Sequence, residues 1–202
     1  MSVSERLPLA PDLLVRELAA CDRPALAFVF GRLGPRSRYQ RFLAAKPELD
    51  ARELERFARV DHWHHDALIA FSPPPRAPVA VARYVRLEDF DTAELAVEVV
   101  DAWQRRGVGR ALVLALRDRA LRAGIRRFRA TLLRENRGAR ALVRELGRVE
   151  RATIGADGVL ELEIVLAPPT AQASPGWSSA GGRVVAEGPG PAERPRRLVR
   201  GG

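Results

Sequence analysis

The sequence predicts a mixed α/β domain in which helices flank a sheet. Segments of strand and helix periodicity follow one another in the order β, α, α, α, β, β, β, α, β, α, β, β, which is not a simple βαβ repeat. Between Glu94 and Arg110, a strand also runs through a glycine-containing turn into a helix. At 202 residues, the chain can form one domain with a substantial core, plus an extension.

The composition is that of an ordinary soluble protein, with 47% hydrophobic and 29% charged residues. No apolar run approaches membrane-spanning length, and the first residues lack the apolar core of a signal peptide. Cys21 is the only cysteine, so the sequence supports neither a disulfide framework nor a cysteine-based zinc site. We therefore expect a cytoplasmic protein that does not associate with membranes.

The net charge of +9 raises the question of a nucleic-acid partner. However, Lys46 is the only lysine, and the arginines are scattered along the chain instead of forming one stripe. Aromatic residues make up only 6% of the sequence, so bases would find few side chains to stack on. We do not expect nucleic acid to be a partner.

The first half of the chain is predicted to alternate helices with strands after a flexible lead-in, residues 1–12, which contains Pro8 and Pro11. Asp22 and Asp50 are expected to cap helices. The short connector after residue 72 predicts that the flanking strands are antiparallel. The expected strands are 13–18, 67–72 and 79–87, and the expected helices are 22–33, 36–43 and 51–60.

The second half is predicted to continue the sheet and to end in a closing hairpin. The expected strands are 94–100, 127–133, 149–154 and 159–166, and the expected helices begin at Val108 and Asn136. The last 35 residues, 168–202, contain 7 Gly and 6 Pro. Such a composition predicts a disordered tail, which leaves residues 13–167 as the folded domain.

The turn around Gly107 and Gly109 has the features of a phosphate-binding loop. A turn that opens a helix leaves backbone N–H groups free at the positive end of the helix dipole. Arg105, Arg106 and Arg110 add positive charge there. The alternative is an ordinary connection between a strand and a helix.

Three known loop types can be compared with this turn. A P-loop requires a lysine that is absent here, and Leu112 stands where the dinucleotide fingerprint has its third glycine. The spacing Gln104-x-x-Gly107-x-Gly109 instead matches the Q/R-x-x-G-x-G/A signature of the GNAT acyltransferases. A second segment, Asn136 to Gly147, matches the helix that follows in that family.

The chain therefore resembles a GNAT N-acetyltransferase from about Leu13 to Leu166. This resemblance implies the GNAT fold, a central, mostly antiparallel twisted sheet flanked by helices, with acetyl-CoA as the acyl donor and no metal. It also implies that Asn136 contacts the pantetheine arm or orders the adjacent strand. The residues expected to bind acetyl-CoA are Val99, Val100, Gln104, Arg105, Arg106, Gly107, Val108, Gly109, Arg110 and Asn136.

Two N-terminal segments, residues 32–43 and 60–68, look like the GNAT domain of bacterial Pat-type protein-lysine acetyltransferases. Those enzymes are best known for acetylating acyl-CoA synthetases. The resemblance implies that the acceptor is an amine and favours a protein lysine, such as one on an acyl-CoA synthetase. The sequence does not predict the oligomeric state.

A lysine with its ordinary pKa of about 10.4 is mostly charged at neutral pH, so acetylation needs a base. Glu94, ten residues before Gln104, resembles the glutamate base of the histone and Pat-type branches. Glu98 has the same strand parity and is the alternative, and either glutamate could instead be solvated or pair with an arginine. A backbone N–H near Val99 or Val100 is expected to polarise the thioester carbonyl.

The chain departs from the family pattern at Val143, where many members have a tyrosine general acid, and neither Tyr39 nor Tyr84 matches that position. Two other functions therefore stay open: a catalytically degenerate sensor that binds acyl-CoA, and an acetyltransferase for small amines. His62, His64 and His65 are of metal-ligand type, but we expect a loop-to-strand junction near the acceptor cleft. The arginines from Arg117 to Arg129 are expected to form a solvated face.

Overall fold

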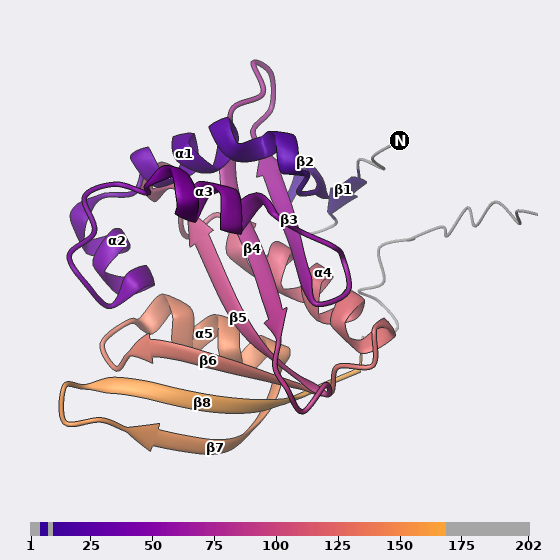
Figure 1. Ribbon diagram of the computed structural model, residues 1–202, viewed down its shortest axis with the longest axis vertical. Coiled ribbons are helices and arrows are strands. Elements are labelled where there is room, and N and C mark those ends of the chain that lie inside the picture. Colours follow the sequence, from indigo (N-terminus) through magenta and orange to yellow (C-terminus); the bar gives the residue numbers. More distant parts are fainter. Residues whose placement is uncertain (1–4, 8–9, 169–202) are drawn as a thin grey trace, which may run out of the picture.

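The computed structural model describes residues 5–7 and 10–168 (Figure 1). Its helices and strands follow the predicted order, with one additional strand at the start and two short 3₁₀ helices, and they confirm the mixed α/β class. The predicted tail lies outside the described residues except for Pro168. The strands are β1 (Glu5–Leu7), β2 (Ala10–Glu17), β3 (His65–Phe71), β4 (Pro78–Arg86), β5 (Thr92–Val99), β6 (Arg127–Leu133), β7 (Gly147–Ile154) and β8 (Val159–Leu166). The helices are η1 (Ala20–Asp22), α1 (Arg23–Gly31), α2 (Pro35–Phe42), α3 (Ala51–Ala58), η2 (Asp101–Trp103), α4 (Val108–Arg122) and α5 (Arg137–Leu146).

In the described residues, eight strands form one sheet in the order β1-β2-β3-β4-β5-β6-β8-β7. Neighbouring strands are antiparallel, as the family resemblance implied, except for β5 and β6, which are parallel. β1 and the start of β2 fall in residues 5–7 and 10–12, where the sequence predicted a flexible lead-in.

The β5–β6 pair is short, because the paired residues are only Thr92–Glu94 on β5 and Arg127–Arg129 on β6. Beyond them the two strands diverge, and Figure 1 shows α2 facing the opening. This divergence positions the site described below.

Helices cover both faces of the sheet (Figure 1). The larger core lies between the sheet and the helices α4 and α5, and it includes Leu112 and Phe128. A smaller core lies under α1 and α3 and includes Leu26 and Ile69. The strand β3 and most of β4 are therefore covered on both sides, which explains why their sequences are so rich in apolar residues.

The two predicted helix caps differ in outcome. Asp50 caps α3 as expected, since its carboxylate accepts the Glu53 N–H at 2.8 Å. The Glu53 carboxylate in turn accepts the Asp50 N–H. Asp22 occupies the cap position of α1, but its side chain makes no capping bond. It instead binds the Arg16 guanidinium at 2.6 and 2.7 Å, because a charged partner lies within reach on β2.

Polar contacts, more than apolar burial, hold α2 in place. None of its residues is buried. Arg41 donates from Nε to the Glu98 carboxylate of β5 at 2.8 Å. Arg38 donates to the carbonyls of Leu33 and Pro47 at 2.9 and 2.6 Å. The Arg41 bond joins α2 to β5, and the Arg38 bonds join it to the chain segments on either side of the helix.

The junction between α5 and β7 requires the absence of a side chain at Gly147. A Cβ there would lie 2.0 Å from the Val165 carbonyl oxygen and 2.7 Å from the Ala167 nitrogen, and both are backbone atoms. We expect Gly147→Ala to lower the free energy of unfolding by more than about 4 kcal/mol, measured by urea unfolding.

Gly138→Ala, in the same helix, provides the control. A Cβ at Gly138 would find its nearest neighbour, Asn136 Oδ1, at 3.6 Å, an ordinary contact. Alanine should therefore be neutral or stabilise the helix by up to about 1 kcal/mol. Equal stability of both variants would contradict the role assigned to Gly147.

Candidate active site

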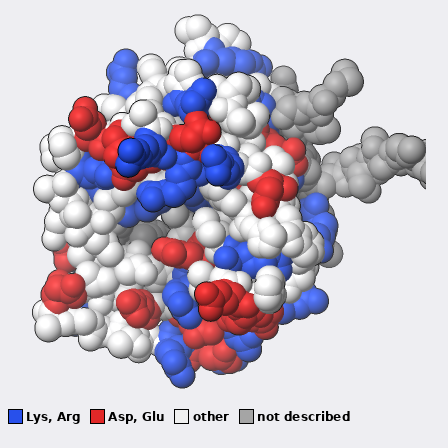
Figure 2. Space-filling view, viewed as in Figure 1, with Lys and Arg blue, Asp and Glu red and all other residues white. Residues whose placement is uncertain are grey.

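The divergence of β5 and β6 opens a cleft of about 710 Å³. Its walls come from β5, β6, α2, the start of α4 and α5. Figure 2 shows a hollow in this face of the molecule, below the side chains that gather over α3. A volume of this size suits a ligand larger than a simple amine.

The loop before α4 ends in an anion-binding geometry. Gly107 has φ +80° and caps α4, and Arg105 has φ +58°, so the backbone curls into the left-handed region twice within three residues. Within the described residues, the N–H groups of Val108, Gly109 and Arg110 have no backbone or side-chain acceptor. Three free donors at a helix N-terminus form a site for a phosphate group.

The three arginines predicted at this loop separate in the structure. Arg105 and Arg110 line the cleft, and Arg110 also pairs with Glu145 at 2.8 Å. Arg106 instead stacks over the Trp103 ring, 5.1 Å from its centroid. The side chain of Val108 is buried in the core, so only its backbone can meet a ligand. The positive charge at the cleft therefore comes from two loop arginines, not three.

Gln104 and Gly109 hold the loop in shape. The Gln104 amide donates to Ser37 Oγ, the Val99 carbonyl and Asp101 Oδ1, each at 3.1 Å. A Cβ at Gly109 would lie 3.4 Å from side-chain carbons of Val99 and Leu142, so the glycine lets α4 approach its neighbours closely. The role of Gln104 in the described contacts is thus to order the backbone of the loop.

Asn136 lines the cleft and has a structural role as well. Its Oδ1 accepts the Ala139 N–H at 3.0 Å, which makes it the N-cap of α5. The side chain thereby fixes the start of the helix that forms one wall of the cleft.

Strand alternation decides which backbone donors face the cleft. The Val100 N–H donates to the Val79 carbonyl at 2.9 Å, so Val100 is not available to polarise a ligand carbonyl. Because N–H directions alternate along an antiparallel strand, the N–H groups of Val97 and Val99 point to the opposite edge, where β6 has diverged. The contact from Gln104 to the Val99 carbonyl lies on that edge. Val97 is therefore a second candidate donor, which the sequence prediction missed.

The two candidate bases differ in their surroundings. Both line the cleft, and both lie on the same face of β5. Glu98 is buried, and its carboxylate is bound to Arg41 at 2.8 Å. Glu94 is exposed and, within the described residues, forms no ion pair or side-chain hydrogen bond. Glu94 is thus free to accept a proton, whereas Glu98 is engaged in holding α2.

Arg83 of β4 is a buried cation next to the face of β5 that carries Glu94 and Glu98. It lies opposite Ala96 in the β4–β5 register, and its guanidinium donates to the Phe57 carbonyl at 3.0 Å. Burial lowers the pKa of Arg83 to about 10, and the negative charge of Glu98 opposes the shift. Neither Arg41 nor Arg83 was predicted, because no local motif marks an arginine that meets a strand distant in sequence.

The two tyrosines of the chain both lie outside the residues that line the cleft. Val143 is buried at the position of the family tyrosine. Tyr84 lies under α4, and burial raises its pKa to about 12. Tyr39 is on the exposed surface of α2. A general acid, where one is needed, has to come from another group or from solvent.

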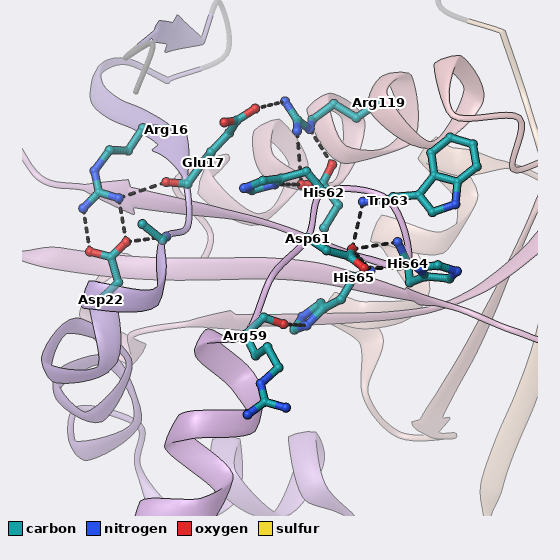
Figure 3. Close-up of polar contacts among 12 residues, drawn as sticks. Arg16, Glu17, Asp22, Arg59, Asp61, His62, Trp63, His64, His65 and Arg119 are labelled. Carbon is teal, nitrogen blue, oxygen red and sulfur yellow. Dashed lines mark hydrogen bonds and ion pairs between the residues drawn. The ribbon is translucent and has the colours of Figure 1, made fainter. Parts of the chain in front are cut away.

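The histidine segment joins α3 to β3 through a network of polar contacts (Figure 3). Asp61 Oδ1 accepts the N–H groups of Trp63, His64 and His65. Burial alone would raise the pKa of Asp61, but these donors and the His64 ring hold it well below its usual range. His65 donates from Nδ1 to the Arg59 carbonyl at 2.8 Å, and burial lowers its pKa.

Asp66 connects the same segment to α4. His62 Nδ1 lies 2.7 Å from Asp66 Oδ1, and Arg119 Nε lies 2.6 Å from Asp66 Oδ2. Figure 3 shows Arg119 also reaching Glu17, at 2.8 Å. Together with Arg117, which is buried and paired with Asp118, Arg119 shows that the predicted solvated arginine face is in part a set of buried ion pairs.

Among residues 5–7 and 10–168, no group of three or more His, Cys, Asp or Glu side chains is arranged to hold a metal ion. In the same part of the chain, no helix has both the length and the apolar character needed to span a bilayer.

Known proteins share this architecture. The chain is 34% identical over 112 residues to the acetyltransferase Pat of Mycolicibacterium smegmatis, a match that covers 55% of this chain and 33% of that protein. It therefore spans about a third of the length of that relative. The GNAT domain of S. lividans PAT superposes with a TM-score of 0.71 at 29% identity, covering 82% of this chain and 97% of that one.

A cAMP-binding acyltransferase from Mycobacterium smegmatis shares the fold, with a TM-score of 0.55 at 24% identity over 83% of this chain and 48% of that one. Residues 36–147, which include α2, the loop before α4 and α5, match the acetyltransferase (GNAT) family. The chain therefore belongs to the GNAT acetyltransferase family.

Proposed function

We propose that the protein transfers an acetyl group from acetyl-CoA to an amine, a lysine side chain of another protein, by direct attack in a ternary complex. The observation that carries this proposal is the cleft between β5 and β6. At one end it has the N–H groups of the α4 N-terminus and at the other the carboxylate of Glu94, and neither has a partner among the residues that the structure describes. The similarity to Pat over residues of both halves of the domain supports a protein lysine as acceptor.

The residues present support each step of the transfer. The loop N–H groups and Arg105 bind the pyrophosphate of the donor. Glu94 accepts the proton of the amine, whose nitrogen then attacks the thioester carbonyl carbon. The N–H groups of Val97 and Val99 stabilise the negative oxygen that forms. The carbon–sulfur bond then breaks, and the CoA sulfur leaves as a thiolate. The nitrogen, now bonded to the acetyl carbon, releases its extra proton to solvent to give the neutral amide, and the thiolate takes a proton from solvent.

One experiment separates this proposal from its alternatives. The purified chain is incubated with acetyl-CoA and either a lysine-containing peptide or a small polyamine, while CoA release and acetyl incorporation are measured. Acetylation of the peptide in preference to the polyamine supports the proposal. Preference for the polyamine would favour a small-amine acetyltransferase.

A second candidate function is a sensor that binds acyl-CoA without catalysis. The position of both tyrosines away from the cleft favours this candidate. Tight binding of acetyl-CoA by calorimetry, with no transfer to either acceptor, would point to the sensor and against the enzyme.

A further inference from the structure

Helix α3 presents arginines to solvent along one face. Arg52 and Arg56 are four residues apart, on the same side of the helix, and Arg59 follows directly after its last residue. All three are exposed. Together with Arg23 and Glu55 they line a groove of about 470 Å³, which we call the α3 arginine groove.

The acidic residues of α3 do not neutralise these arginines. Glu53 pairs with Lys46 and Glu55 pairs with Arg23, each at 2.6 Å. No ion pair within the described part of the chain includes Arg52, Arg56 or Arg59. The groove therefore carries uncompensated positive charge.

The groove lies beside the acceptor end of the cleft. The Arg59 carbonyl accepts a hydrogen bond from His65, and His65 pairs across the sheet with Val85, which pairs in turn with Glu94. Two strand spacings thus separate His65 from Glu94, about 10 Å. Val85, between them, is 44% exposed, so this part of the sheet is open to a ligand. Figure 2 shows Lys and Arg gathered over α3, directly above the hollow.

We propose that the α3 arginine groove binds acidic residues that flank the target lysine of the acceptor protein. This inference rests on the proposed function. An extended chain advances about 3.3 Å per residue, so acidic side chains about three to five positions from the lysine reach the groove when the lysine meets Glu94.

A polypeptide fits this groove better than a nucleic acid does. Arg52 and Arg59 are separated by about 10 Å along the helix, which matches about three residues of extended chain. A duplex presents phosphates over a longer and more continuous surface. Charge complementarity at such a patch chiefly raises the encounter rate and the specificity for one partner.

The test uses two peptides of equal length with one lysine. One carries Glu at positions about three to five from the lysine on both sides, and the other carries Gln there. We expect kcat/KM for the Glu peptide to exceed that for the Gln peptide about tenfold at low ionic strength, mainly through KM. The difference should shrink as salt is added.

Two double variants with equal changes in charge assign the effect to the groove. Arg52→Glu with Arg56→Glu should remove the preference for the Glu peptide. Arg148→Glu with Arg151→Glu, on the exposed edge strand β7 at the opposite end of the sheet from β1, should keep it. Thermal unfolding and acetyl-CoA binding of both variants check that the fold and the donor site are intact.

The outcomes separate this inference from the proposed function. Equal rates with both peptides in the wild type would overturn the inference and leave the enzyme in place. No transfer to either peptide, with acetyl-CoA bound, would overturn the proposed function and the inference with it. Salt-dependent binding of a DNA duplex that only the α3 variant loses would reassign the groove to nucleic acid.

Discussion

The Glu94→Gln variant is expected to lose about a hundredfold or more of its transfer rate at neutral pH. Glutamine keeps the size of the side chain but cannot accept the proton of the attacking amine. Because Glu94 is exposed and forms no ion pair within the described residues, its replacement should leave the stability and the affinity for acetyl-CoA unchanged. Initial rates and calorimetric binding measure the two effects separately.

The pH dependence gives a second measure of the same role. Without a base, only the fraction of amine that is already deprotonated reacts. The rate of Glu94→Gln should therefore keep rising with pH toward the ordinary lysine pKa of about 10.4, and the difference from the wild type should narrow. A loss of constant size across this range would argue for a structural effect.

Glu98→Gln is the matched control on the same face of β5. This change weakens the ion pair with Arg41, so its expected effects are a loosened α2 and lower thermal stability. If the rate of Glu98→Gln kept rising with pH toward the lysine pKa while that of Glu94→Gln did not, the assignment of the base would have to be exchanged.

The Gly107→Glu variant is expected to weaken acetyl-CoA binding about a hundredfold or more, because it adds a negative charge at the loop that we propose binds the pyrophosphate of the donor. Gly107 also has φ +80°, a conformation that costs a residue with a side chain about 1 kcal/mol or more. Calorimetric titration with acetyl-CoA gives the affinity directly.

Gly124→Glu separates the local charge from the backbone strain. Gly124 has φ +85° and follows the opposite end of α4, and a Cβ at this position would have no neighbouring atom within 4 Å. This variant has the same strain and the same charge, yet it should bind acetyl-CoA as the wild type does. Equal losses in both variants would indicate that helix stability, and not the phosphate loop, controls binding.

Local patterns predicted the elements and the loop. Glycine spacing and the change from strand to helix periodicity identified the turn before α4, where Gly107 takes a left-handed conformation. The capping bonds of Asn136 and Asp50 each join residues only three positions apart in the chain. Such short-range chemistry can be read directly from sequence.

Contacts between side chains could not be predicted from local sequence patterns in this way, least of all where the segments are far apart in the chain. Arg41 meets Glu98 across 57 residues, and Arg119 meets Asp66 across 53. Trp103 is only three residues from Arg106, but no local pattern indicates that Arg106 stacks on it while Arg105 lines the cleft. The bond from the Val100 N–H to the Val79 carbonyl depends on strand register, which no local pattern in either strand fixes.

The pairing of β5 with β4 also fixes the groups that we propose for catalysis relative to one another. Glu94 and the N–H groups of Val97 and Val99 belong to one strand, which is hydrogen-bonded along its length to β4. Their spacing is consequently set by covalent geometry and does not change when α2 moves. Inserting or deleting one residue between positions 94 and 99 would therefore turn the carboxylate and the amide donors toward opposite sides.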